Sequence, residues 1–252
     1  MKIVLIGAGN VATHLGEVLY QANHQMLQVY SRNEANAHVL ANRINAQAIS
    51  QLTDVNTHAD IYILSVIDDA LEAVIQSLPP LNGIVVHTAG SVSMDVLARF
   101  SKHGVFYPFQ TFTKGVQVNF NTIPILIESE QDEVNKKLTC LAQELSSSVL
   151  QASSHQRGQL HIAAVYACNF VNHMYRLADE VLQKSDLPFS LLHPLIKETA
   201  DKVQRRSPEK TQTGPAARND QQIITKHLDA LKDNEELYAV YKQLTQSILK
   251  RL

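Results

Sequence analysis

The sequence has few cysteines, no excess of charge of one sign and no long apolar run. Its 252 residues include two cysteines, Cys140 and Cys168, which lack the spacing of a metal site or a disulfide framework. The formal net charge is -2, so no overall attraction to nucleic acid or to a membrane surface is expected. No apolar stretch reaches membrane-spanning length, and the N-terminal run is too short for a signal peptide. We therefore expect a protein of a reducing, cytoplasmic setting that binds neither nucleic acid nor membrane.

Short apolar runs alternate with helical patterns through the first part of the chain. The runs are continuous and rich in β-branched residues, which is typical of strands buried on both faces of a parallel sheet. Helical patterns separate them at the spacing of βαβ units. This arrangement predicts an α/β fold with a doubly wound parallel sheet, a Rossmann domain. The principal predicted strands cover residues 2–6, 26–30, 61–66 and 83–87.

The pattern changes after Ser153, where strand patterns end. Residues 155–183 contain no proline and predict one long helix, and its many small residues indicate that it is buried. Three further helices are expected over residues 189–205, 219–231 and 235–252. We therefore expect a Rossmann domain at residues 1–152, followed by a smaller all-α domain at residues 153–252 that serves substrate binding and dimerisation.

A glycine-rich loop joins the first predicted strand to the first predicted helix. It matches the dinucleotide fingerprint G-x-G-x-x-G/A. The first glycine permits a tight turn, the second lets the backbone approach a pyrophosphate, and a small third residue allows close packing of helix on sheet. The N–H groups at the helix N-terminus complete an anion site. The alternative is a glycine-rich turn in a protein that has lost its cofactor. The predicted cofactor-binding residues of the loop are Gly7, Gly9, Asn10, Val11 and Ala12.

The end of the second predicted strand distinguishes NADP from NAD. NAD-binding proteins place an acidic residue there, about 20 residues after the loop, to bind the ribose hydroxyls. This chain instead has Ser31 and Arg32, with no carboxylate before Glu34. Arg32 can form charge-assisted hydrogen bonds with a 2′-phosphate, so we predict NADP; the alternative is a solvated surface arginine. Two residues that end a later strand are expected to line the cofactor path or simply to pack there, Ser65 and Val66.

With these residues in place, the chain resembles the 6-phosphogluconate dehydrogenase-like superfamily. That superfamily includes 3-hydroxyisobutyrate dehydrogenases, pyrroline-5-carboxylate reductases, ketopantoate reductases and deazaflavin-dependent NADP oxidoreductases. The chain is more closely similar to the bacterial family in which a Rossmann-like domain precedes a domain of unknown function numbered 2520 (DUF2520). It departs from that family's usual pattern at Tyr107, where histidine is usual, and at Asn219, where glycine is usual. The segments that carry the closer resemblance are residues 87–91, 107–112, 161–169 and 213–220.

The resemblance implies hydride transfer and a proton donor near the start of the first long helix of the second domain. In the superfamily this donor is often a lysine, with an asparagine further along the helix. Residues 156–175 contain no lysine, and His161 occupies roughly that place. His161 and Asn169 lie about 80° apart around an ideal α-helix, on neighbouring faces. We predict His161 as the donor and Asn169 as the residue that orients the substrate; the alternative is that both are polar residues of helix packing.

Polar residues near other predicted strand ends are candidates for substrate binding. His87 and Ser91 follow one strand and Gln110 follows another, so their side chains are expected in the crevice at the carboxyl ends. Arg218 follows a Gly-Pro turn and could anchor a substrate carboxylate. The alternatives are a serine-capped turn after His87 and, near Arg218, a helix start capped by Asn219 or Asp220. No residues have the spacing of a metal site.

Two functions fit the sequence. The first is an NADP-dependent oxidoreductase that transfers a hydride between NADP(H) and a small keto acid, hydroxy acid or imine, with ketopantoate a candidate through the resemblance alone. The second is a non-catalytic NADP-binding regulatory or scaffold protein, which the missing lysine and the changed residue Tyr107 keep open. The resemblance also implies a homodimer through the helical domain. Apolar residues near the C-terminus fit that role or pack within the chain, namely Leu237, Val240, Tyr241, Leu244 and Ile248.

Overall fold

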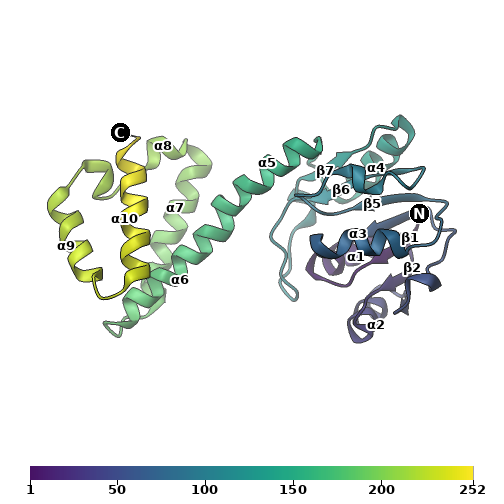
Figure 1. Cartoon of the computed structure of the whole chain (residues 1–252), viewed down its shortest axis with the longest axis horizontal. Coiled ribbons are helices and arrows are strands. Elements are labelled where there is room, and N and C mark those ends of the chain that lie inside the picture. Colours follow the sequence, from purple (N-terminus) through teal and green to yellow (C-terminus); the bar gives the residue numbers. More distant parts are fainter. Residues whose placement is uncertain (252) are drawn as a thin grey trace. The chain divides into compact units, whose positions relative to one another are not determined.

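The computed structural model describes residues 1–251, which form two compact units (Figure 1). The first unit is Met1–Cys168 and contains the whole sheet, and the second is Asn169–Leu252 and is helical. The sheet ends at Gln151, beside the boundary predicted after residue 152, and the helix that follows it belongs to the first unit by its contacts. Within residues 1–251, every helix is too short or too polar to cross a membrane.

The first unit is built on one eight-stranded sheet with the order β3-β2-β1-β4-β5-β6-β7-β8. Neighbouring strands are parallel, except that β7 runs antiparallel to β6. The predicted α/β fold, a doubly wound Rossmann domain followed by a helical region, is therefore confirmed. The strands are β1 (Lys2–Ile6), β2 (Gln25–Tyr30), β3 (Gln47–Ile49), β4 (Ile61–Leu64), β5 (Ile84–His87), β6 (His103–Pro108), β7 (Ile125–Glu128) and β8 (Val149–Gln151).

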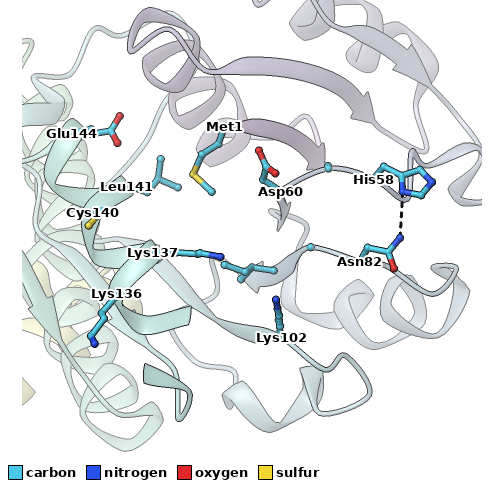
Figure 2. A pocket seen from close by; sticks show the side chains of 13 residues that line it. Met1, His58, Asp60, Asn82, Lys102, Lys136, Lys137, Cys140, Leu141 and Glu144 are labelled. Atoms are coloured by element: carbon cyan, nitrogen blue, oxygen red, sulfur yellow. Dashed lines mark hydrogen bonds between the residues drawn. The ribbon is translucent and has the colours of Figure 1, made fainter. Parts of the chain in front are cut away.

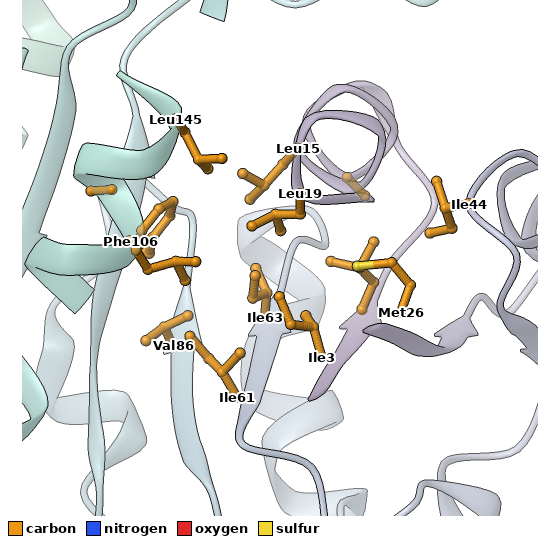
Figure 3. Close-up of a cluster of buried hydrophobic side chains, with 14 of the residues drawn as sticks. Ile3, Leu15, Leu19, Met26, Ile44, Ile61, Ile63, Val86, Phe106 and Leu145 are labelled. Carbon is orange, nitrogen blue, oxygen red and sulfur yellow. The ribbon is translucent and has the colours of Figure 1, made fainter. Parts of the chain in front are cut away.

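Helices cover both faces of the sheet, because successive residues of a buried strand point to opposite faces. In β1, Ile3 belongs to the apolar cluster that includes Leu15 of α1, and Figure 3 shows this cluster between helix and sheet. Its neighbour Val4 belongs to the opposite cluster, with Leu71 of α3. The helices of this unit are α1 (Asn10–Gln21), α2 (Glu34–Arg43), α3 (Asp68–Ser77), α4 (Asp132–Leu145) and α5 (Ser154–Ala164), with short 3-10 turns at η1 (Leu52–Asp54), η2 (Met94–Leu97) and η3 (Phe120–Thr122).

The strand order reverses direction beside β1. From β1 the chain moves outward to β2 and β3, and it then returns to β4 on the other side of β1. Loops that leave neighbouring strands in opposite directions open a crevice at the carboxyl ends, where open α/β sheets bind ligands. The loops after β1 and β4 therefore form the expected ligand-binding edge of the first unit.

The second unit is a set of helices with a small core of its own. Leu177, Ile224 and Leu237 are among its buried residues. Asp220 and Asn234 accept backbone hydrogen bonds at the starts of α9 and α10. The elements are α6 (Phe170–Gln183), η5 (Phe189–Leu192), α7 (His193–Arg205), α8 (Pro208–Thr211), η6 (Ala216–Arg218), α9 (Gln221–Leu231) and α10 (Glu235–Leu249).

The long helix predicted over residues 155–183 differs from the expectation in two ways. A π-helical segment, Val165–Asn169, interrupts it between α5 and α6. The helix was also expected to be buried, and this is wrong for the single chain, since only Arg157 and Leu177 are buried in its described part. Small side chains permit close packing, but they do not show whether the packing partner lies in the same chain.

Candidate functional site

A cavity of about 800 Å³ runs along the carboxyl ends of five neighbouring strands. Its walls follow the order of the sheet from β2 through β1, β4 and β5 to β6. The lining residues include Ser31 and Arg32 after β2, Gly7–Val11 after β1, Ser65–Asp68 after β4, Thr88–Gly90 after β5, and Tyr107, Pro108 and Gln110 at β6, with His161 from α5. One continuous space thus joins the predicted cofactor loop to the predicted chemical groups of the first unit.

The two glycines of the loop after β1 leave space that a side chain at either position would occupy. Gly7 has φ +130°, and a Cβ there would lie 2.1 Å from the Ser65 carbonyl oxygen. Gly9 precedes α1, and a Cβ there would meet no described atom within 4 Å, so this part of the backbone faces open space. No side chain of the described residues caps α1, which leaves its first N–H groups available. The loop therefore fits a pyrophosphate held by backbone N–H groups.

Helix α1 approaches the sheet closely at Gly16, a residue that the sequence analysis missed. A Cβ at Gly16 would lie 2.7 Å from Cδ1 of Leu5. Ala12, the predicted packing residue of the fingerprint, is fully buried and does not line the cavity among the described residues. In the sequence, the indication of this helix–sheet contact was the glycine at position 16, one turn after Ala12.

The β2 end of the cavity carries a positive charge. Arg32 is exposed, lines the cavity and forms no ion pair with any residue in the described range 1–251. The Ser31 hydroxyl accepts a hydrogen bond from the Asn33 amide, which shapes the turn. An unneutralised guanidinium beside a serine hydroxyl fits the extra phosphate that distinguishes NADP from NAD.

Two predicted substrate-binding residues, His87 and Ser91, help to hold the loop after β5. His87 is fully buried, and its Nδ1 accepts a hydrogen bond from the Ala89 amide. Ser91 is exposed, and its hydroxyl donates to Asp68, which lines the cavity. Neither His87 nor Ser91 itself lines the cavity within the described chain, so their contribution to the site in this structure is to shape the Ala89–Ser91 backbone.

Tyr107 and His161 meet over the next residue of that loop, Gly90. The Tyr107 Oη lies 3.5 Å from Nδ1 of His161. A Cβ on Gly90 would lie 2.7 Å from that phenol oxygen and 3.0 Å from the same imidazole nitrogen. The departure from the family pattern at Tyr107 therefore places a phenol beside the predicted donor, and glycine leaves room for both rings.

Arg157 organises this end of the site, and the sequence analysis did not single it out. Its guanidinium is fully buried, pairs with Glu128 at the end of β7, and donates to the carbonyl oxygens of Ala89 and Val92. Glu128 also accepts hydrogen bonds from the amide and hydroxyl of Ser154. Arg157 thus connects α5, one turn before His161, to the loop that Gly90 belongs to.

Two predicted residues, Asn169 and Arg218, lie in the second unit. Asn169 is exposed and ends the π-helical segment, so the angle of about 80° from His161, which assumed a regular α-helix, does not apply. Arg218 is exposed at the end of η6. The residue after it, Asn219, has φ +53°, a left-handed conformation that glycine and asparagine adopt most readily. Asn219, the second departure from the family pattern, can therefore adopt the backbone conformation that the usual glycine would adopt there.

A second cavity, of about 650 Å³, lies at the opposite edge of the sheet (Figure 2). Asp60 and Lys102 immediately precede β4 and β6, so they mark the amino ends of the strands. Lysine and carboxylate side chains both line it, which gives it mixed charge. In residues 1–251, no group of three or more histidine, cysteine, aspartate or glutamate side chains could hold a metal ion.

Comparisons with known proteins agree with this arrangement. Residues 1–109 match a Rossmann-like domain and residues 123–248 match the domain of unknown function DUF2520. A provisionally assigned NADP oxidoreductase from Bacteroides fragilis is 43% identical, with a TM-score of 0.92 over 99% of this chain and 98% of that one. No curated protein matches the chain.

Two more distant structures share the fold alone. An imine reductase from Myxococcus stipitatus, in complex with NADP+, is 15% identical with a TM-score of 0.69, over 100% of this chain and 99% of that one. A reductive aminase from Aspergillus terreus, in complex with NADPH and ethyl-5-oxohexanoate, is 14% identical with a TM-score of 0.75, over 99% and 94%.

The buried His87 makes stability depend on pH. Burial first, and the Arg157 charge second, lower its pKa from 6.5 to about 4. Because the unfolded chain binds this proton more readily, the contribution of His87 is fully present above pH 6.5 and is lost as the pH falls toward 4. Between pH 7.5 and 5.0 we expect the wild-type free energy of unfolding to fall about 2 kcal/mol further than that of His87→Asn, measured by urea denaturation.

A matched control is His38→Asn, since His38 is an exposed residue of α2. This variant should keep the pH dependence of the wild type. An equal loss of stability in the wild type and in His87→Asn would contradict the prediction.

Proposed function

This chain belongs to the DUF2520 family, and we propose that it is an NADP-dependent oxidoreductase. One observation carries the proposal. A single cavity follows the carboxyl ends of five strands, from Arg32 at one end, past the glycine loop, to Tyr107 and His161 at the other. The strand order reverses between β1 and β4. An extended dinucleotide bound across this point would place one half on the β1 side and the other half on the β4 side.

The residues at each position fit parts of NADP. Ser31 and Arg32 would hold the 2′-phosphate, and the Gly7–Ala12 segment would hold the pyrophosphate. Ser65 and Val66 would line the path toward the nicotinamide, since both line the cavity after β4. The bound cofactor would supply or accept a hydride, and the protein would supply orientation and a proton.

We propose a small carbonyl or imine compound as the substrate. The fold shared with an imine reductase and a reductive aminase supports the imine class, and the superfamily resemblance supports keto acids such as ketopantoate. His161 would take part in proton delivery and Asn169 would orient the substrate. Gln110 would contribute a polar side chain to the same cavity, while His87 and Ser91 would shape its wall. Arg218 would anchor a carboxylate.

A second candidate is an NADP-binding protein without turnover. The observation that favours it is the absence of lysine from residues 156–175, where the superfamily often places its donor. The pairing of Tyr107 with His161 favours the enzyme, since either group can supply a proton. A reducing, cytoplasmic setting is proposed for both candidates, which the two unpaired cysteines support.

The cofactor preference is testable at Arg32. Replacing Arg32 with glutamine should weaken NADPH binding by about 10- to 100-fold, because a charge-assisted hydrogen bond contributes about 1.5–3 kcal/mol. NADH binding should change little, and the wild type should bind NADPH more tightly than NADH. Dissociation constants from fluorescence titration measure both effects. Arg43→Gln is a matched control, since Arg43 is an exposed arginine of α2 paired with Glu17.

Turnover is testable with His161→Ala. The wild type should oxidise NADPH with at least one member of a panel of keto acids and cyclic imines. The variant should lower kcat while leaving the NADPH dissociation constant nearly unchanged, because His161 acts on the proton and not on the cofactor. His155→Ala, an exposed residue of the same helix, should match the wild type. NADPH binding without any oxidation across the panel would favour the second candidate.

We also propose that the chain forms a homodimer through its helices. Large apolar side chains remain about half exposed on α5, α6, η5 and α7, namely Ile162, Val181, Leu191, Leu195 and Val203. Of the face predicted on α10, Leu237 is buried within its own chain and Tyr241 bonds to His227. Light scattering should therefore give about twice the mass of one chain, and Leu195→Asp should lower it. A monomeric wild type would contradict the proposal.

A further inference from the structure

We infer that the phenol of Tyr107 is the group that donates the proton to the substrate, and that His161 returns a proton to it. This inference rests on the proposed oxidoreductase function. In this inference Tyr107, on the sheet, contacts the substrate, and His161, on α5, supplies the proton that replaces the one Tyr107 gives up. Four observations of the first unit carry it: position, space, strand support and charge.

Tyr107 has the position of a donor. It lies near the carboxyl end of β6, and its ring is partly buried in the wall of the cavity that contains the glycine loop. Lys114 also lines this cavity, but Tyr107 and His161 are the two groups of general-acid type that meet beside Gly90. The phenol and the imidazole lie 3.5 Å apart, from Oη to Nδ1, a long contact of the kind that shortens when substrate binds and a proton is transferred.

Gly90 provides the space for the pair. A Cβ at this position would lie 2.7 Å from Oη and 2.8 Å from Cζ of Tyr107, closer than real contacts allow. It would also lie 3.0 Å from Nδ1 of His161. The backbone of the loop after β5 therefore passes directly beside both donor atoms, which only a residue without a side chain permits.

Strand pairing holds Tyr107 in place. In the ladder Tyr107 pairs with Leu126 of β7, within a strand that also pairs with β5 on its other side. The Phe109 ring packs edge-on against it, with centroids 6.0 Å apart. His161 lies one turn beyond the anchored Arg157 on α5, beside the exposed residues Ile162 and Ala163. Groups on paired strands keep the narrow geometry that proton transfer requires.

The charges around Tyr107 suit a phenol that gives up a proton transiently. Burial raises its pKa, so the group is protonated at neutral pH, while the Arg157 charge acts in the opposite direction and Asp68 adds to the raising effect. The buried guanidinium of Arg157 lies one turn before His161 on α5 and would stabilise a phenolate.

The proton balance of the step is complete. Addition of a hydride to the carbon of a C=O or C=N group leaves the electron pair on the heteroatom. The Oη–H bond of Tyr107 then breaks as a new O–H or N–H bond forms on the product. The phenolate takes a proton from Nδ1 of His161, which regains one from water through its other nitrogen. The oxidation of an alcohol or amine runs through the same transfers in reverse.

The test is Tyr107→Phe, which keeps the ring and removes only the hydroxyl. We expect kcat for NADPH oxidation to fall at least 100-fold, as loss of a general acid implies, with the NADPH dissociation constant unchanged within twofold. Tyr20→Phe, an exposed tyrosine of α1, is the matched control and should retain the wild-type kcat. Retention of wild-type kcat in Tyr107→Phe, with loss in His161→Ala, would make His161 the direct donor and overturn the inference.

A second measurement does not depend on turnover. In the cofactor-free protein, the ¹⁵N chemical shift of His161 Nδ1 should change in Tyr107→Phe and stay constant in Tyr20→Phe, because only the first variant removes the partner of that nitrogen. An unchanged shift in Tyr107→Phe would overturn the inference. If the wild type oxidises no NADPH with any compound of the panel, the proposed function fails, and the shift alone then decides whether the two side chains are coupled.

Discussion

The ion pair between the buried Arg157 and the partly buried Glu128 is the contact on which the Tyr107 and His161 end of the cavity depends. A guanidinium removed from water costs several kcal/mol unless every donor finds a partner. Each of the three guanidinium nitrogens of Arg157 has a partner, namely Glu128 or the carbonyl oxygens of Ala89 and Val92. These carbonyls flank Gly90, so the same contacts that compensate the charge also fix the loop beside Tyr107 and His161. Removing Glu128 would leave the Arg157 charge buried without its counter-ion, and removing Arg157 would free both the loop and α5.

The two ends of the cavity are built by different physical means. At the cofactor end, the geometry follows from backbone properties that are local in sequence, namely the positive φ of Gly7, the open approach at Gly9 and the free N–H groups of α1. At the chemical end, side chains distant in sequence must meet. Tyr107 comes from β6 and His161 from α5, and Arg157 reaches back to the loop after β5. Cofactor affinity and turnover should therefore respond to different substitutions.

This difference explains how much could be predicted from the sequence. The buried strands, the glycine loop and the Ser31–Arg32 pair are local patterns; the strands form the predicted sheet, and the loop and the pair line one cavity at its edge. Arg157 was missed because a single arginine in a polar helical segment looks the same whether it is solvated or buried. The angle between His161 and Asn169 failed because nothing in the residue pattern announced the π-helical segment. Helix burial was wrong because small residues specify close packing without specifying the partner.

Tyr107 shows why a departure from a family pattern needs a structural interpretation. By sequence alone, a tyrosine in place of the usual histidine weakened the case for catalysis. In the structure the phenol occupies the wall of the cavity and lies beside His161, above a glycine that leaves room for both. Both residue types can donate a proton, but a buried phenol keeps its proton at neutral pH, whereas a buried imidazole such as His87 tends to lose it. In the inferred mechanism the substitution thus preserves proton donation, and it makes the donor less sensitive to pH over the neutral range.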